Sequence, residues 1–294
     1  MTMTKDLRAD AAASGTFQLG GLTINRMGFG AMRVTGPGIW GEPRDPAEAK
    51  RVLRRVVELG VNFIDTADSY GPEVSERLIA EALHPYPAGL IIATKGGLTR
   101  AGPEQWAPVG RAEYLSQCVE MSLRRLRVDC IELYQLHRID PRVPVEESLG
   151  ALKKLQQAGK IRHVGLSEVS VAELQQAQKI LPIVSVQNLY NIGNRQSEPL
   201  LEHCERHRIG FIPWFPIAGG DLVKPGGVLD SAAKRHGVTV SQLALAWLLH
   251  RSPVMLPIPG TSSVKHLEEN VAASSLRLSV SEWQEIERAV KSNG

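Results

Sequence analysis

The sequence has few cysteines, and they do not form the pattern of a disulfide framework or a metal site. Only Cys118, Cys130 and Cys204 occur in 294 residues. An odd number without paired spacing favours reduced thiols, so we expect a cytoplasmic protein rather than a secreted, disulfide-linked one. No cysteine or histidine spacing is typical of metal ligands, and no metal is expected.

Long hydrophobic runs and blocks of like charge are also missing. The apolar stretches are only as long as strands, so no membrane span is predicted. Residues 1–14 carry charges without the apolar centre of a signal peptide, and residues 1–15 are expected to form a flexible tail. The net charge is +3, from 34 basic and 31 acidic residues. This even distribution gives no support to nucleic-acid binding, while a slight positive excess is compatible with a phosphate-bearing cofactor.

The Gly-x-Gly-x-x-Gly fingerprint of an open dinucleotide-binding sheet is absent as well. Instead, short apolar runs alternate with helical patterns along the chain, which indicates a single α/β domain, a (β/α)8 TIM barrel over residues 16–294. Two alternating segments around Gly20-Gly21 predict an N-terminal β-hairpin. Asp45 followed by Pro46 marks the start of the first helix. The eight predicted strands are residues 26–28, 61–65, 90–95, 130–135, 163–166, 183–187, 211–214 and 254–258, and an extra amphipathic helix covers residues 281–290.

Polar residues stand where three of the predicted strands end. The run Val61–Ile64 leads into Asp65 and then Tyr70, the next run ends at Lys95, and a third ends at His137. In a parallel barrel these ends share one mouth, where catalytic residues gather. Each residue also has a simpler explanation, because such an aspartate often caps a helix, a tyrosine packs, a lysine forms a Schiff base as in aldolases, and a histidine is structural. The joint order of the four favours catalysis.

These four residue types suit the reduction of a carbonyl group. We expect Tyr70 to donate the proton, and Lys95 to lower the tyrosine pKa from its usual value of about 10. Asp65 would keep Lys95 charged and oriented, and His137 would position the carbonyl oxygen. A side chain cannot supply a hydride, so a cofactor must.

In order and context, the four residues resemble the catalytic tetrad of the aldo-keto reductases, and the resemblance extends from about Phe17 to the C-terminal helix. Within that family the sequence is most similar to bacterial pyridoxal reductase (pyridoxine 4-dehydrogenase)-like members. The shared segments are Gly28-Phe29-Gly30-Ala31-Met32, Gly36-Pro37-Gly38 and Ile258-Pro259-Gly260-Thr261-Ser262-Ser263.

The resemblance implies a nicotinamide nucleotide and a set of residues that hold it. Ser167 and Gln187 correspond to ligands of the carboxamide, and Trp214 to the aromatic residue that stacks on the nicotinamide ring. A loop from Phe215 to Leu222 would cover the pyrophosphate. The whole implied set is Gly30, Ala31, Met32, Ser167, Gln187, Trp214, Phe215, Pro216, Ile217, Gly219, Leu222, Ile258, Gly260, Ser262, Ser263, Lys265, His266, Glu269 and Asn270.

Two positions depart from the family pattern. Ser262 and Ser263, followed by Lys265, occupy a segment where many relatives carry an arginine for the 2′-phosphate, so NADPH is favoured while NADH stays open. Glu168 follows Ser167 where many relatives have asparagine, which would weaken a carboxamide contact.

The resemblance implies an NADPH-dependent reductase of an aldehyde or ketone, with pyridoxal as the first specific substrate and a monomeric state as the default. Trp40 and Trp106 lie in long loops and are expected to line the substrate pocket. Two other functions stay open. One is a regulatory, redox-sensing barrel that binds nicotinamide nucleotide and turns over slowly, and the other is a Schiff-base lyase at Lys95.

Overall fold

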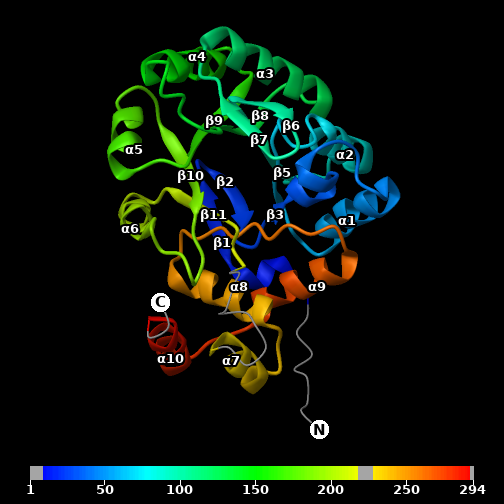
Figure 1. Cartoon of the computed structure of the whole chain (residues 1–294), viewed down its shortest axis with the longest axis vertical. Helices are drawn as coiled ribbons and strands as arrows, with labels where there is room; N and C mark the ends of the chain where they lie inside the picture. The colour runs from blue at the N-terminus through cyan, green and yellow to red at the C-terminus, as the bar shows by residue number, and fades with distance from the viewer. Residues whose placement is uncertain (1–8, 218–227, 292–294) are drawn as a thin grey trace.

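The computed structural model describes residues 9–217 and 228–291, and a curled parallel sheet forms its centre (Figure 1). Seven strands are hydrogen-bonded in the order β11-β10-β9-β8-β5-β4-β3, and each neighbouring pair is parallel. The strands are β3 (Phe29–Gly30), β4 (Phe63–Asp65), β5 (Ile91–Gly96), β8 (Ile131–Leu136), β9 (Ile161–Ser167), β10 (Ile183–Leu189) and β11 (Gly210–Trp214).

An extended segment closes the gap between the two edge strands. The Leu256 amide donates to the Phe211 carbonyl of β11 at 2.8 Å, and the Gly28 amide donates to the Pro257 carbonyl at 2.9 Å. Residues 254–258, predicted as the eighth strand, therefore bond to both edges through single bridges rather than a full ladder. The first strand was predicted at residues 26–28 and lies slightly later in the structure, at Phe29 and Gly30. These two residues pair with Ile64 and Asp65.

Helices surround the sheet, which explains why its strands read as continuous apolar runs (Figure 1). All six residues of β5 are buried, as expected for a strand covered on both faces. The helices are α1 (Pro46–Glu58), α2 (Val74–Leu83), α3 (Ala112–Leu126), α4 (Val145–Gln157), α5 (Val171–Gln178), α6 (Glu198–His207), α7 (Val228–His236), α8 (Val240–Arg251), α9 (Val264–Ala272) and α10 (Val280–Lys291). The predicted start of α1 is confirmed, since the Asp45 side chain accepts from the Glu48 amide behind Pro46.

The predicted N-terminal hairpin is also confirmed, and it closes one end of the barrel. Strands β1 (Thr16–Leu19) and β2 (Leu22–Asn25) pair antiparallel. Their Leu19 and Ile24 side chains join an inner cluster with Phe63, Leu133 and Ile212 from the barrel strands. Because this apolar cluster fills the end where the strands begin, the polar site must lie at the other end, where the strands finish.

Two segments differ from the sequence-based expectation. Within the predicted tail, Ala11–Ser14 form the 3-10 helix η1, in which Ala11 and Ser14 are buried, so the packed chain begins before residue 16. Residues 96–110, predicted as an irregular loop, contain the hairpin β6 (Leu98–Gly102) and β7 (Gln105–Pro108). The pattern of this hairpin was hidden because both strands are short, β7 is mostly exposed, and the buried residues of β6 lie only at its two ends.

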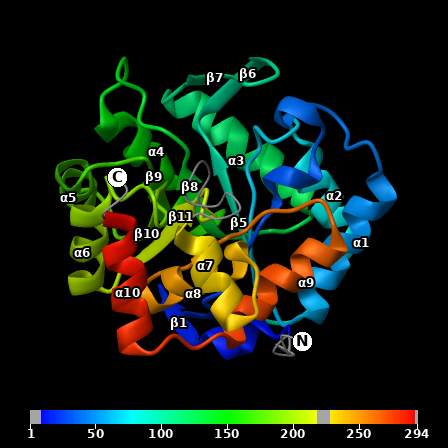
Figure 2. The same cartoon turned by 60° about the horizontal axis from the view of Figure 1, so that its bottom comes forward.

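The C-terminal helix α10 lies beside α7 and α8 on the outside of the barrel (Figure 2). Its Glu287 carboxylate accepts from the indole N–H of fully buried Trp247 in α8 at 2.9 Å and pairs with Arg195 at 2.6 Å. The Arg195 guanidinium also lies over the Trp247 ring, 4.7 Å from its centroid. These contacts fasten the helix to the barrel through a buried carboxylate.

Removing that carboxylate should destabilise the protein. We expect Glu287→Ala to lower the free energy of unfolding by about 2 kcal/mol or more, because a buried indole N–H and a guanidinium lose their acceptor. Glu285→Ala on the same helix is the matched control, since Glu285 makes an exposed ion pair with Arg235 and should cost less than about 1 kcal/mol. Urea unfolding curves measure both. Equal losses would mean that Glu287 does not fasten α10.

Candidate active site

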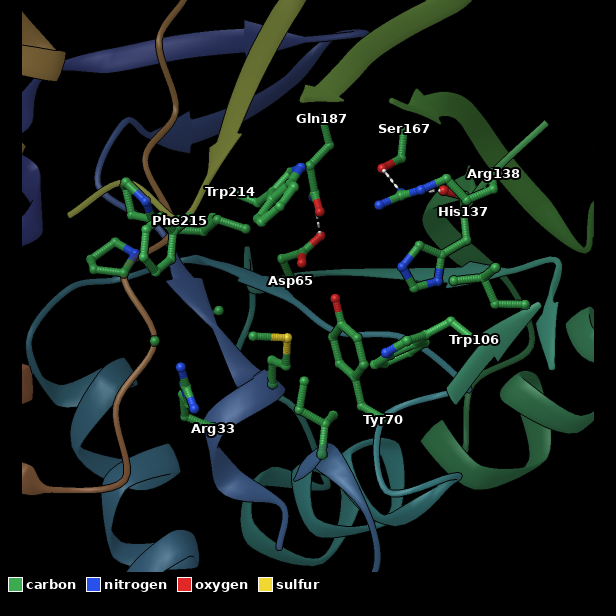
Figure 3. Close-up of a pocket in the computed structure, with 18 of the residues that line it drawn as sticks. Arg33, Asp65, Tyr70, Trp106, His137, Arg138, Ser167, Gln187, Trp214 and Phe215 are labelled. Atoms are coloured by element: carbon green, nitrogen blue, oxygen red, sulfur yellow. Dashed lines mark hydrogen bonds between the residues drawn. The ribbon is translucent and has the colours of Figure 1, made fainter. Parts of the chain in front are cut away.

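The four predicted catalytic residues meet at the open end of the barrel, where Figure 3 shows Asp65, Tyr70 and His137. Asp65 ends β4, Lys95 lies near the end of β5, and His137 directly follows β8. Tyr70 comes from the loop between β4 and α2. The Lys95 ammonium donates to the Asp65 carboxylate at 2.6 Å, to the Thr66 carbonyl at 2.9 Å and to the Tyr70 hydroxyl at 3.2 Å. Strand ends that are far apart in the sequence thus build one hydrogen-bonded group.

The Asp65 carboxylate has further partners from two neighbouring strands. Gln135 of β8 and Gln187 of β10 each donate an amide N–H to Oδ1 at 2.9 Å. Gln187 was predicted as a carboxamide ligand, and here its amide is turned to Asp65. Gln135 was not predicted, although it stands two residues before His137 on a strand whose side chains alternate, and in register with Lys95.

Burial determines the protonation of Tyr70 and Lys95. Burial raises the pKa of Tyr70 above its ordinary value and outweighs the opposing effect of the Lys95 charge. The sequence-based expectation of a lowered tyrosine pKa is therefore wrong in direction for the protein alone, and the phenol stays protonated at neutral pH. Burial by itself lowers the pKa of Lys95, but the Asp65 carboxylate, together with the hydrogen bond to Tyr70, reverses that effect and raises the pKa overall. At neutral pH, Lys95 is therefore an ammonium that lies beside the protonated phenol of Tyr70.

The imidazole of His137 is neutral at physiological pH. Burial lowers its pKa well below the ordinary value, and the nearby charges of Lys95, Arg138 and Arg100 lower it further. Its Nδ1 lies 3.3 Å from the Ser69 hydroxyl, and its ring meets that of Tyr70 edge-on with centroids 5.9 Å apart. A neutral imidazole held through Nδ1 can direct Nε2 at a substrate oxygen.

A cavity of about 720 Å³ opens above this group. It contains three tetrad residues, one of the two predicted substrate-loop tryptophans and ten of the nineteen residues implied to hold the nucleotide. The full lining is Gly30, Met32, Arg33, Ile39, Asp65, Tyr70, Leu98, Trp106, Pro108, His137, Arg138, Ile139, Ser167, Gln187, Trp214, Phe215, Pro216, Ile217, Ile258, Pro259 and Gly260. A volume of this size suits a small molecule bound against apolar walls.

Several predicted residues lie outside this lining. Trp40 is one of them; its ring lies 5.5 Å from the Arg100 guanidinium, and its role as a pocket wall stays a prediction. The other described residues of the predicted nucleotide set that do not line the cavity are Ala31, Ser262, Ser263, Lys265, His266, Glu269 and Asn270. Gly219 and Leu222 lie outside the described residues.

Of the residues outside the lining, Ser262, Ser263, Lys265 and His266 lie at the start of α9, Glu269 and Asn270 lie further along that helix, and Ala31 begins the 3-10 helix η2 (Ala31–Val34). Gly30 and Gly260 bring two backbones together at the edge of the cavity, because a Cβ on Gly30 would lie 2.7 Å from the Ile258 carbonyl oxygen. Ser263 precedes α9 without capping it through its side chain. The Lys265 side chain is 81% exposed and its ammonium lies 4.0 Å from the Glu269 carboxylate, at the end of the helix where an anion would bind.

Two arginines of the lining were not predicted. Arg33 follows the Gly30–Met32 segment by one residue, and Arg138 directly follows His137. Arg138 donates to the Ser167 hydroxyl at 2.9 Å and to the His137 carbonyl at 2.6 Å (Figure 3). Both could have been found as basic neighbours of predicted site residues, and together they make the cavity attractive to negative charge.

The structure explains the departure at Glu168. This residue adopts a left-handed backbone conformation with φ of 54°, and its carboxylate accepts from the Trp214 indole N–H at 2.5 Å and from the Leu189 amide at 2.7 Å. Instead of facing a carboxamide, Glu168 fixes the orientation of the Trp214 ring in the cavity wall. The two residues form a matched pair that single positions in the sequence do not reveal.

Comparison with known proteins agrees with this geometry. The sequence profile of the Aldo/keto reductase family matches residues 26–291. The chain belongs to the aldo/keto reductase family. It is 55% identical to an uncharacterized oxidoreductase of Schizosaccharomyces pombe over 283 residues, covering 96% of this chain and 92% of that protein. It is 43% identical to pyridoxine 4-dehydrogenase of Escherichia coli over 273 residues, covering 91% and 95%.

A solved structure of an aldo-keto reductase from Klebsiella pneumoniae in complex with NADPH is also similar. The TM-score is 0.80 at 25% identity, over 93% of this chain and 94% of the other. The barrel prediction is thereby confirmed, and this aldo-keto reductase is an NAD(P)H-dependent carbonyl oxidoreductase that acts on a small molecule. Across residues 9–217 and 228–291, every helix is too short or too polar to cross a membrane.

The neutral state of His137 should be visible in the pH dependence of this aldo-keto reductase. A free histidine loses its proton near pH 6.5, whereas His137, with its lowered pKa, has already lost it at a lower pH. We therefore expect kcat/KM for an uncharged aldehyde to show no inflection near 6.5 as the pH falls from 8 to 6. Blanks without protein correct for acid decay of NADPH. An inflection near 6.5 that disappears in His137→Gln would show that His137 titrates there.

Proposed function

We propose that this protein reduces an aldehyde or ketone to the alcohol with NADPH, and that pyridoxal, which would become pyridoxine, is a substrate. The observation that carries the proposal is the buried Lys95 ammonium, which hydrogen-bonds both Asp65 and the Tyr70 hydroxyl at the floor of a cavity. This arrangement positions one proton donor beside a fixed positive charge.

Each residue of the group then has a distinct task. NADPH, when bound, supplies the hydride that side chains cannot provide. Tyr70 protonates the carbonyl oxygen as negative charge develops there, and Lys95 stabilises the phenolate that remains. Asp65 holds Lys95 charged and is itself held by Gln135 and Gln187. Neutral His137 donates a hydrogen bond that orients the carbonyl without competing for its proton.

The residues around the cavity fit a dinucleotide. An oriented Trp214 ring and the Ser167 hydroxyl stand in the wall near the tetrad, where a nicotinamide ring would bind. The lining continues through Phe215, whose side chain is 51% exposed, to the segment before α9. Lys265 and His266 near that helix start favour the extra phosphate of NADPH, which NADH lacks.

Pyridoxal is supported by the walls of the cavity and by one relative. A planar aromatic ring suits the space beside Trp106, Ile39 and Leu98. The E. coli pyridoxine 4-dehydrogenase, 43% identical, is named for the alcohol that pyridoxal reduction would give. A Schiff-base role for Lys95 is disfavoured, because an ammonium with three hydrogen-bond acceptors and a raised pKa is a poor nucleophile.

Replacing the proton donor tests the mechanism. Tyr70→Phe should lower kcat by about 10²-fold or more, which is the contribution expected from a positioned general acid. The NADPH dissociation constant should stay within about twofold, since only a hydroxyl is removed. Stopped-flow kinetics and fluorescence titration measure the two quantities. Turnover that survives in this variant would remove Tyr70 from the role of acid.

A substrate and cofactor panel tests the specificity. We expect pyridoxal to be reduced with a kcat/KM at least about tenfold above that of simple aliphatic aldehydes, and NADPH to be preferred over NADH. NADPH oxidation followed by absorbance gives both comparisons, with the alcohol identified by chromatography. Equal rates across the panel would keep the reductase and reject pyridoxal. Tight NADPH binding without turnover of any carbonyl would instead support a regulatory, nucleotide-sensing barrel.

A further inference from the structure

Arg100 of the β6–β7 hairpin makes an unusual number of contacts for a residue outside the cavity lining. A guanidinium has five N–H donors, and the structure gives it five backbone carbonyl acceptors. Nε donates to Gln105 at 3.1 Å, Nη1 to Ile39 and Ser69 at 2.8 Å each, and Nη2 to Gly38 at 3.0 Å and Gly102 at 3.3 Å. The five acceptors match the five donors of an arginine, and the Ile39 and Gly38 carbonyls accept a second hydrogen bond from the Gly71 and Glu104 amides.

These carbonyls belong to three segments that are separate in the sequence. Gly38 and Ile39 lie in the turn η3 (Pro37–Ile39), and Ser69 directly precedes the proton donor Tyr70. Gly102 and Gln105 belong to the hairpin itself. One side chain thus joins the η3 turn, the Tyr70 loop and the hairpin above the open end of the barrel.

The same guanidinium supports Trp106. It lies flat against the indole, 3.6 Å from the ring centroid, while Trp106 also meets Tyr70 and His137 with centroids 6.4 and 6.3 Å away. Trp106 lines the cavity and Arg100 does not. Arg100 therefore holds the indole from behind, and the indole faces the atoms that would receive a substrate.

The η3 turn needs such support as well. Ile39 lines the cavity with φ of 54°, a left-handed conformation that is strained for a β-branched residue. Its carbonyl is held by Arg100 at 2.8 Å and by the Gly71 amide at 3.2 Å. Strained backbone of this kind persists only where surrounding contacts fix it.

We propose that Arg100 is a positioning residue for the substrate, which holds Trp106 and Ile39 as a rigid wall and so selects planar aromatic carbonyl compounds over small aliphatic ones. The proposal rests on the reductase function proposed above. A ring stacked against this wall would present its carbonyl to Tyr70 and His137 in a narrow range of orientations. A small aliphatic aldehyde would depend only on the tetrad.

The test compares two substrates in four single variants and one double variant. Arg100→Met removes all five donors, and Arg100→Lys keeps the charge but has only three donors without a planar fork. Trp106→Ala removes the indole from the wall and keeps the hydrogen bonds from Arg100 to the backbone carbonyls. Arg162→Lys is the control. Arg162 lies near the start of β9, at the end of the strand away from the site, and it forms an exposed ion pair with Glu132. The substrates are 2-naphthaldehyde and propanal, each with NADPH.

For 2-naphthaldehyde, we expect both Arg100 variants to raise KM about tenfold to a hundredfold, the range that a misplacement of about 1 Å produces. For propanal, kcat and KM should change less than about threefold in the two Arg100 variants, and the NADPH dissociation constant should change less than about twofold in them. Combining Arg100→Met with Trp106→Ala should add nothing to the effect of Trp106→Ala alone, because both act through one wall. The Arg162→Lys protein should match the unmodified protein with both substrates.

Several outcomes would overturn the proposal. An equal loss of kcat/KM with both substrates would show that Arg100 acts only on the Tyr70 loop. Additive effects in the double variant would show that Arg100 and Trp106 act independently. If Arg100→Met does not fold, a second result still tests the proposal. An unchanged preference of Trp106→Ala for 2-naphthaldehyde over propanal would show that the wall does not select the substrate. Failure of the unmodified protein to reduce either aldehyde is a different result, since it would reject the reductase function itself.

Discussion

The buried ion pair of Lys95 and Asp65 is the interaction on which the site depends. Both side chains are almost fully removed from solvent, and burying two charges costs free energy that their attraction alone does not always offset. Here the remaining donors and acceptors are satisfied by Thr66, Gln135 and Gln187. The pair therefore requires the ends of β4, β5, β8 and β10 to be in register, and the chemistry of the site is inseparable from the closure of the sheet.

The opposite end of the barrel makes this possible. The hairpin β1–β2 inserts Leu19 and Ile24 among apolar residues of the barrel strands, so hydrophobic burial provides the stability at the end where no polar group is needed. The polar end can then carry desolvated charges and a cavity. This division of tasks also explains why a tyrosine with a raised pKa is tolerated, since a protonated phenol is the form that burial favours.

The sequence reveals those parts of the site that follow from periodicity and strand order. Asp65, Lys95 and His137 could be predicted because apolar runs end at them, and parallel strands bring such ends together. Contacts that depend on side-chain direction could not. Gln187 turns to Asp65, the Trp40 ring lies 5.5 Å from the Arg100 guanidinium, and Glu168 holds Trp214. Each of these pairs residues from different elements, and a single sequence carries no signal for such partners.

The residues that shape the substrate pocket are attached to the catalytic group in a way that leaves its geometry intact. Lys95, Asp65 and Gln135 are held by the sheet, whereas Arg100 holds Ile39 through its backbone carbonyl and Trp106 through its indole ring, with further hydrogen bonds to the neighbouring backbone carbonyls. Because those acceptors are main-chain atoms, the neighbouring side chains can differ without loss of the hydrogen bonds. Substrate preference can thus change through the hairpin and the η3 turn while proton donation from Tyr70 continues, since Arg100 itself contacts the Tyr70 loop at the Ser69 carbonyl and not at a side chain of the catalytic group. The wall of Trp106 and Ile39, which depends on Arg100, can therefore vary in sequence while the barrel and its catalytic group stay the same.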